Sequence, residues 1–223
     1  MAQATRTTSV PAGLSDNPME NASDWARSNQ RPILIAVGTI AVVALLIFGY
    51  RYNDRSTNEQ AAAALTRAQL TAQQGPASTT TLAALNGVVQ KYGKTSSGQQ
   101  AALLLAQTHY EAGQYAEGVK ALEGQVGSAT SDFAASFEQM IAMGYEAQAK
   151  HDLAAEHFAK AAAASKFAQD KATYQAAQAH ALMSAGKLDA AKALWQELSD
   201  REDPRFAQEA QVRLGEIAGL ASK

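Results

Sequence analysis

The chain has 223 residues, a formal net charge of −2, four His and no Cys. The near-neutral charge argues against a protein that binds nucleic acid mainly through phosphate contacts. The lack of Cys excludes disulfides, thiolate metal sites and cysteine nucleophiles. Aromatic residues make up only 7% of the chain and Ala is abundant, which favours helices over sheet. We therefore expect an all-α protein.

Residues 1–31 form a polar N-terminal tail without an apolar period, rich in Ser, Thr, Ala, Asn and Gln. Such a segment has too little apolar surface to offset the entropy lost on ordering it. We expect this tail to be disordered on its own.

Residues 32–50 form a long apolar segment that contains no charged side chain. As a helix it is about 28 Å long, close to the thickness of a bilayer's hydrocarbon core. A cleaved signal peptide has a shorter apolar region and a small-residue cleavage site, so we predict an uncleaved transmembrane helix over 32–50. The expected membrane-interface residues are Trp25, Arg27, Arg31, Tyr50, Arg51 and Tyr52.

The charges around this span do not determine its orientation, because arginines lie on both sides of it. The span holds no His, Asp, Glu or Lys, which excludes axial haem ligation by a span His and a proton relay through it. Small residues along it permit close contact with another membrane helix: Gly38, Ala41, Ala44 and Gly49.

After a juxtamembrane segment over 51–60, residues 61–223 are predicted to form a helical repeat domain. Gly and Pro separate its apolar stretches, and no alternation typical of strands occurs. Helices are expected near 57–74, 79–91, 99–112, 115–126, 132–149, 152–164, 169–185, 188–199 and 204–220.

This domain repeats itself with steps of 36 and 37 residues, which align Gly113, Ala149 and Gly186. Small residues coincide before these turns, at Ala106, Ala142 and Ala179, and bulky ones after them, at Leu122, Phe158 and Trp195. A small residue lets two helices approach closely, and a bulky residue fills the remaining space. The pattern predicts a helical solenoid of about four helix pairs and a capping helix.

The residues Leu105-Ala106, Tyr110, Gly113-x-Tyr115, Gly118 and Leu122 resemble a tetratricopeptide repeat. The second copy departs from that pattern with Ala149 at the turn and His151 in place of an aromatic residue. The layout of residues 24–220 also resembles the ancillary subunit family of the bacterial Sec translocon. That resemblance implies the bacterial inner membrane, a cytoplasmic N-terminus, a periplasmic repeat domain, and contact with the translocon and periplasmic chaperones.

No nucleophile, phosphate-binding or metal motif is present in the sequence. The four histidines are scattered, and an acidic cluster near residues 197–203 lies where one predicted helix ends and the next begins. We expect no enzyme activity, no metal and no cofactor.

In tetratricopeptide repeats the first helix of each pair lines a concave protein-binding face. Carried over by the alignment, that face comprises Gln100, Leu103, Gln107, Tyr110, Ser136, Gln139, Met143, Glu146, Thr173, Ala176, His180 and Met183. The set is nearly neutral and lacks a Lys/Arg clamp, which favours loose recognition of apolar or extended segments. The alternative is that these side chains pack against the neighbouring repeat.

Two functions remain open. The first is a membrane-anchored adaptor at the translocon with a chaperone-like role on exported or membrane proteins. The second is a constitutive accessory subunit of a larger membrane complex, respiratory or photosynthetic for example. Both predict a hetero-oligomeric membrane complex: contact with the bilayer, protein partners bound through the repeats and through helix packing in the membrane, and no nucleic acid.

Overall fold

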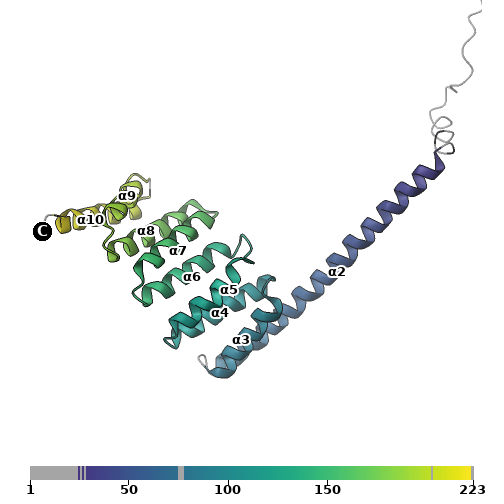
Figure 1. Ribbon diagram of the computed structural model, residues 1–223, viewed down its shortest axis with the longest axis horizontal. Helices are drawn as coiled ribbons and strands as arrows, with labels where there is room; N and C mark the ends of the chain where they lie inside the picture. Colours follow the sequence, from purple (N-terminus) through teal and green to yellow (C-terminus); the bar gives the residue numbers. More distant parts are fainter. Residues whose placement is uncertain (1–24, 26, 28, 75–77, 202, 222–223) are drawn as a thin grey trace, which may run out of the picture. The chain divides into compact units, whose positions relative to one another are not determined.

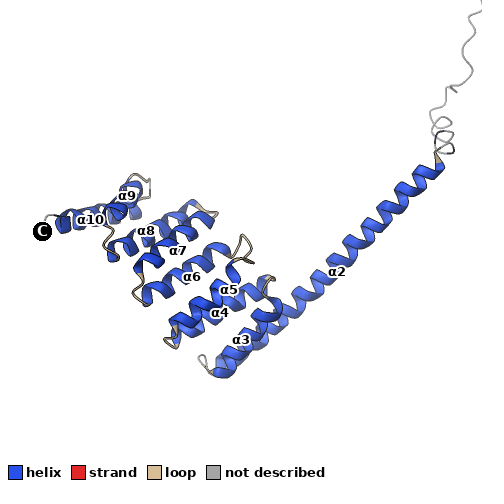
Figure 2. Cartoon of the chain, viewed as in Figure 1, coloured by secondary structure: helices blue, strands red, loops and turns tan. Residues whose placement is uncertain are grey.

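The computed structural model describes Trp25, Arg27 and residues 29–74, 78–201 and 203–221. In these residues all regular secondary structure is helical, as predicted (Figure 2). The N-terminal tail was predicted to be disordered on its own. Its residues 1–24 lie outside the described part of the chain. The chain divides after Asp54 into two units, which are taken one at a time.

Helix α2 runs without a break from Gln30 to Gln74, over 45 residues. Residues 51–60, expected as a juxtamembrane segment, are helical and continue α2. No Gly or Pro occurs between Gly49 and Gly75, and extending a formed helix costs far less than starting a new one. The polar residues after the apolar stretch therefore do not end the helix.

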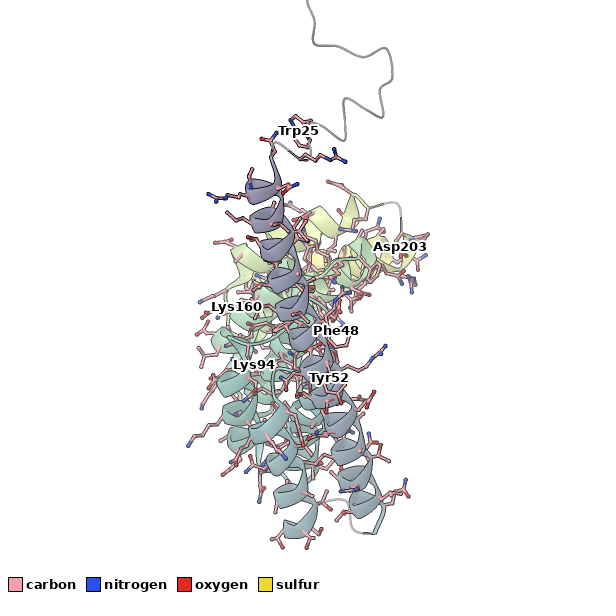
Figure 3. The ribbon with its side chains drawn as sticks, turned by 90° about the vertical axis from the view of Figure 1, so that its right-hand side faces the viewer. Trp25, Phe48, Tyr52, Lys94, Lys160 and Asp203 are labelled. Atoms are coloured by element: carbon pink, nitrogen blue, oxygen red, sulfur yellow. The ribbon has the colours of Figure 1, made fainter. Side chains whose placement is uncertain are left out.

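Within the first unit, the apolar stretch of α2 exposes its large side chains in every direction, from Leu34 (70% exposed) to Phe48 (69%). Figure 3 labels Phe48 and Tyr52 on this helix. In the described part of the chain, α2 is the one helix long and apolar enough to cross a membrane, and none of its most apolar stretch is buried.

The described residues of the second unit form the remainder of α2 and eight shorter helices, and each of these eight packs against the next one along the chain (Figure 1). Their bounds are α3 Thr79–Tyr92, α4 Ser96–Glu111, α5 Tyr115–Val126, α6 Ala134–Ala147, α7 His151–Ala164, α8 Ala168–Ser184, α9 Leu188–Ser199 and α10 Pro204–Ala221. Helix pairs α4–α5, α6–α7 and α8–α9 are the three aligned copies of the repeat. Helix α3 precedes them, and α10 follows them where the capping helix is predicted.

The repeat pattern is confirmed by the core. The small residues Ala106, Ala142 and Ala179 are all 0% exposed, and so are the bulky Leu122 and Trp195. Two buried clusters divide the unit, one running from α2 to α6 and the other from α6 to α10. Because successive pairs bury their faces against one another, each depends mainly on its neighbours.

The turns within the three pairs share a left-handed backbone residue at the aligned position. Gly113 has φ +73°, Gly186 has φ +75°, and Ala149 has φ +56°. Glycine adopts this conformation without steric cost, whereas Cβ of alanine crowds the following carbonyl oxygen. The substitution noted in the sequence therefore leaves the middle turn strained.

Ala149→Gly is expected to raise the free energy of unfolding by about 0.5–1 kcal/mol, since relief of the left-handed strain exceeds the added entropy of the unfolded chain. Gly113→Ala and Gly186→Ala are the matched reverse changes, and each should lower the free energy of unfolding by about 1 kcal/mol through left-handed strain. No steric clash adds to this loss, because a Cβ at either site meets no neighbouring atom within 4 Å. Thermal unfolding followed by circular dichroism measures all three. If all three substitutions changed the free energy of unfolding in the same direction, the strain assigned to the turn at Ala149 would be contradicted.

Candidate protein-interaction face

The predicted binding face lies on α4, α6 and α8, the first helices of the three pairs. Its exposed members are Gln100, Gln107, Met143 and Thr173. Its half-buried members are Leu103, Tyr110, Ser136, Gln139, Glu146, His180 and Met183. Ala176 is buried. Eleven of the twelve residues therefore reach solvent at least in part.

Polar contacts join neighbouring first helices along this face. The hydroxyl of Tyr110 donates to the carbonyl oxygen of Met140 at 2.9 Å, which links α4 to α6. The hydroxyl of Tyr174 lies 3.4 Å from Oε1 of Gln139, which links α6 to α8. His180 Nε2 and Glu209 Oε1 lie 2.8 Å apart and link α8 to α10. The structure thus brings residues of all three repeats together.

Tyr110 packs against both α5 and α6. A Cβ added at Gly118 on α5 or at Gly144 on α6 would overlap its side chain, so the ring occupies space that these two glycines leave open. This burial raises the pKa of the Tyr110 phenol. Ala176 is likewise only 7% exposed. Both side chains therefore pack against neighbouring helices, Tyr110 in part and Ala176 almost completely.

His180 connects three helices of the last repeat. Its ring meets the indole ring of Trp195 on α9 edge-on, with 4.9 Å between ring centroids, and it pairs with Glu209 on α10. The imidazole is therefore held in place by its own chain.

The accessible remainder of the face consists mainly of amides, hydroxyls and methionine. Amides supply both donors and acceptors, and exposed Met143 supplies an adaptable apolar contact. Glu146 is the one carboxylate among the predicted residues, and partial burial raises its pKa, while His151 and His180 act in the opposite direction. Such a surface suits the backbone and apolar side chains of a polypeptide.

Other polar pairs hold the first helices to the second ones. Glu138 on α6 and His157 on α7 lie 2.6 Å apart, with both side chains about one-tenth exposed. The Tyr145 hydroxyl donates to Glu123 at 2.6 Å, and this bond to a carboxylate raises the pKa of Tyr145 to about 12. His157 is thus a packing residue. In the described residues, no three His, Asp or Glu side chains are grouped so that they could hold a metal ion.

Two residues that contact the face, Tyr174 and Glu209, were not predicted from the sequence. The positions aligned with Tyr174 are Ala101 and Phe137, both 0% exposed, so the repeat pattern predicts a core side chain there. Glu209 lies on the capping helix, where the alignment offers no repeat to compare. Neither residue carried a usable signal in the sequence.

Among known proteins, a model of the family described as "Tetratricopeptide repeat-like domain" matches residues 23–134, which begin before α2 and end at α6. No curated protein matches this chain. A crystal structure of a kinesin light chain from Podosopora anserina with nearly identical TPR-like repeats is 18% identical, covers 75% of this chain and 86% of its own, and has a TM-score of 0.53.

A substituted form of that same Podosopora anserina protein is 20% identical, covers 74% of this chain and 92% of its own, and has a TM-score of 0.47. At these identities the likeness of the first structure shows the fold alone. The family match spans just over half of the chain, and it includes the first aligned copy of the repeat, with Ala106, Gly113 and Leu122. The chain belongs to the tetratricopeptide repeat-like domain family.

Proposed function

We propose that this chain is a membrane-anchored adaptor, in which residues 32–50 of α2 cross a bilayer and the repeat domain binds other proteins. The observation that carries the anchor is the exposure of large apolar side chains on every side of that stretch, between 48% and 70% from Leu34 to Phe48. A contiguous apolar surface of this kind is not stable in water, whereas a lipid environment covers it completely.

The local chemistry of α2 supports the same role. Thr39, the most polar side chain of the stretch, donates its hydroxyl to the carbonyl oxygen of Ile35 at 2.8 Å, so it carries no unsatisfied donor into hydrocarbon. Tyr50 and Tyr52 are 75% and 71% exposed at one end, and Trp25 is 63% exposed at the other. Aromatic rings at both ends match the two membrane interfaces.

For the location and partners, we propose the bacterial inner membrane, with the N-terminus in the cytoplasm and the repeats in the periplasm beside the Sec translocon. This proposal rests on the resemblance of the chain's layout to the translocon's ancillary subunit family. The nearly neutral, amide-rich binding face supports it, because exported chains share a backbone and apolar side chains rather than a common charged motif. The binding is non-catalytic.

A second function, a constitutive subunit of a larger membrane complex, is favoured by one feature of α2. Gly38 and Gly49 have no neighbouring atom within 4 Å of an added Cβ, so both remain open for close contact with another membrane helix. In this case the span packs among integral subunits and the repeats brace their extramembrane parts.

The anchor is tested by extraction of native membranes with alkaline carbonate. We expect the unmodified chain to stay in the membrane pellet and an Ile40→Arg/Val43→Arg double variant to move into the soluble fraction, because each arginine at mid-span costs about 2.5–3.5 kcal/mol. An Ile40→Leu/Val43→Leu variant is the matched control and should stay in the pellet. Release of the unmodified chain by carbonate would overturn the anchor.

The two functions are separated by gentle detergent extraction and mass spectrometry of the proteins that co-purify with the chain. An adaptor should co-purify with translocon subunits, chaperones and diverse exported chains, each in a substoichiometric amount relative to this chain. Gln107→Glu/Gln139→Glu should reduce this set, since both changes place charge on a nearly neutral face. A single fixed, salt-resistant set of integral subunits would instead support the accessory subunit and contradict the adaptor.

A further inference from the structure

The beginning of the second unit differs in charge from the rest of it. Residues 55–110 contain one acidic residue, Glu59, and four basic ones: Arg55, Arg67, Lys91 and Lys94. Residues 111–223 contain 11 basic and 16 acidic residues. An anionic surface therefore attracts the first helices of the unit and repels the later ones.

The four cations of this basic region are not neutralised by the chain itself. In the described part of the chain none of them forms an ion pair, whereas Lys160, Lys166 and Lys187 of the later repeats each pair with a carboxylate. Lys91 instead lies over the ring of Tyr92, 5.0 Å from the ring centroid. The positive charge can therefore act on a ligand from outside.

Two of these cations line a hollow of about 470 Å³ beside the turn between α3 and α4. Lys91 comes from the end of α3 and Lys94 from the turn, which Figure 3 labels, while Thr57 comes from α2 and Gln125 from α5. No Asp or Glu is among the described residues that line it. Ammonium and amide groups without a carboxylate suit a phosphate group.

The turn that carries Lys94 is held by its own hydrogen bonds. The hydroxyl of Thr95 donates to the carbonyl oxygen of Tyr92 at 2.8 Å and accepts from the backbone N–H of Gly98 at 3.1 Å. The phenol of buried Tyr92 donates to Oε1 of Gln60 on α2 at 3.5 Å. The backbone that bears both lysines is therefore fixed, and only their exposed side chains adjust to a ligand.

We propose that this hollow binds the phosphate of an anionic phospholipid headgroup. Lys91 and Lys94 supply the charge, and the amides of Gln90 and Gln125, which also line the hollow, supply hydrogen-bond donors. The inference rests on the proposed membrane anchor, because the anchor is what brings the hollow to a bilayer.

The place of the hollow along the chain favours a lipid as the source of the phosphate. Thr57 follows Tyr50, at the end of the apolar stretch, by seven residues of α2, which is a helical rise of about 10 Å. At physiological salt, charges act over about 8–10 Å before screening removes their effect. Basic clusters that follow a membrane span this closely bind anionic headgroups.

The test measures lipid binding to the full chain in detergent by native mass spectrometry, with phosphatidylglycerol and phosphatidylcholine as the probes. We expect the anionic lipid to bind more tightly than the zwitterionic one, and Lys91→Gln/Lys94→Gln to weaken its tightest site about tenfold. Lys171→Gln/Lys192→Gln is the matched control. It removes two equally exposed charges from α8 and α9, so it should leave binding unchanged.

Four results would overturn the proposal. The first is equal binding of the two lipids, and the second is unchanged binding of phosphatidylglycerol to Lys91→Gln/Lys94→Gln with an intact circular dichroism spectrum. The third is binding of inorganic phosphate as tight as that of the lipid, which would make free phosphate the ligand. The fourth is binding of an octaglutamate peptide that phosphatidylglycerol does not displace, which would make an acidic protein segment the ligand.

The membrane anchor fails by a different measurement. Release of the unmodified chain by alkaline carbonate contradicts the anchor, and lipid binding in detergent does not decide that result. A chain that stays in the membrane pellet but does not distinguish the two lipids contradicts the headgroup site alone.

Discussion

Trp195→Ala is expected to lower the free energy of unfolding of the last repeat by about 4 kcal/mol, the largest loss among the substitutions considered. Trp195 is 0% exposed and is the largest fully buried side chain among the described residues. Its removal leaves a cavity between α8, α9 and α10, and it deletes the ring contact with His180. Hydrogen–deuterium exchange measures the loss helix by helix.

The loss should be local. The buried cluster that contains Trp195 runs from α6 to α10, and the cluster from α2 to α6 is separate from it. Since pairs in a solenoid depend mainly on their neighbours, amide protection should fall in α8, α9 and α10 and stay unchanged in α3 and α4. Uniform loss of protection along the chain would show that the repeats unfold as one unit.

Trp195→Phe is the matched control for this prediction. Nε1 of Trp195 is buried without a hydrogen-bond partner among the described atoms, and an unsatisfied buried donor is itself unfavourable. Phenylalanine keeps an aromatic ring and removes that donor, so we expect a loss of no more than about 1.5 kcal/mol. A loss as large as that of alanine would mean that the indole nitrogen contributes a bond.

The fold followed from the sequence because one constraint recurs three times. Each pair needs a small residue, a tight turn and a bulky residue at fixed offsets, and such spacing survives even where Ala149 replaces glycine. The length of α2 could not be predicted from the sequence, because the polar residues Arg51, Asn53 and Asp54 indicate the end of the apolar span and not whether the helix continues. Once a helix has formed, exposed polar residues extend it at little cost.

The binding face was only partly predictable, for a different reason. The first helix of each pair contacts three neighbours, so an exposed stripe and a packing stripe lie side by side on it. Periodicity places Ala176 and Gln139 on the same stripe, yet the first is buried and the second is half-buried. The side chains of other helices decide this, as Gly118 and Gly144 do for Tyr110.

Gly98→Ala is expected to lower the free energy of unfolding by about 3 kcal/mol, at the upper end of typical overpacking costs. Gly98 lies in the first turn of α4, and an added Cβ would overlap the carbonyl group of Tyr92 and lie 2.8 Å from the backbone nitrogen of Gly93. Because these are main-chain atoms, no change of rotamer relieves the contact, and the turn between α3 and α4 must open. Hydrogen exchange in α3 and α4 and thermal unfolding measure the loss.

Gly87→Ala makes the same chemical change inside α3, five residues before that helix ends at Tyr92, and should have the opposite effect on stability. Gly87 is an exposed residue inside α3, and an added Cβ there meets no atom within 4 Å. Alanine is the better helix former, so stability should rise by about 0.8–1 kcal/mol. If both substitutions were stabilising, the turn between α3 and α4 would have to be wider than the structure shows. If both were destabilising, the exposed side of α3 at Gly87 would have to be in contact with another molecule.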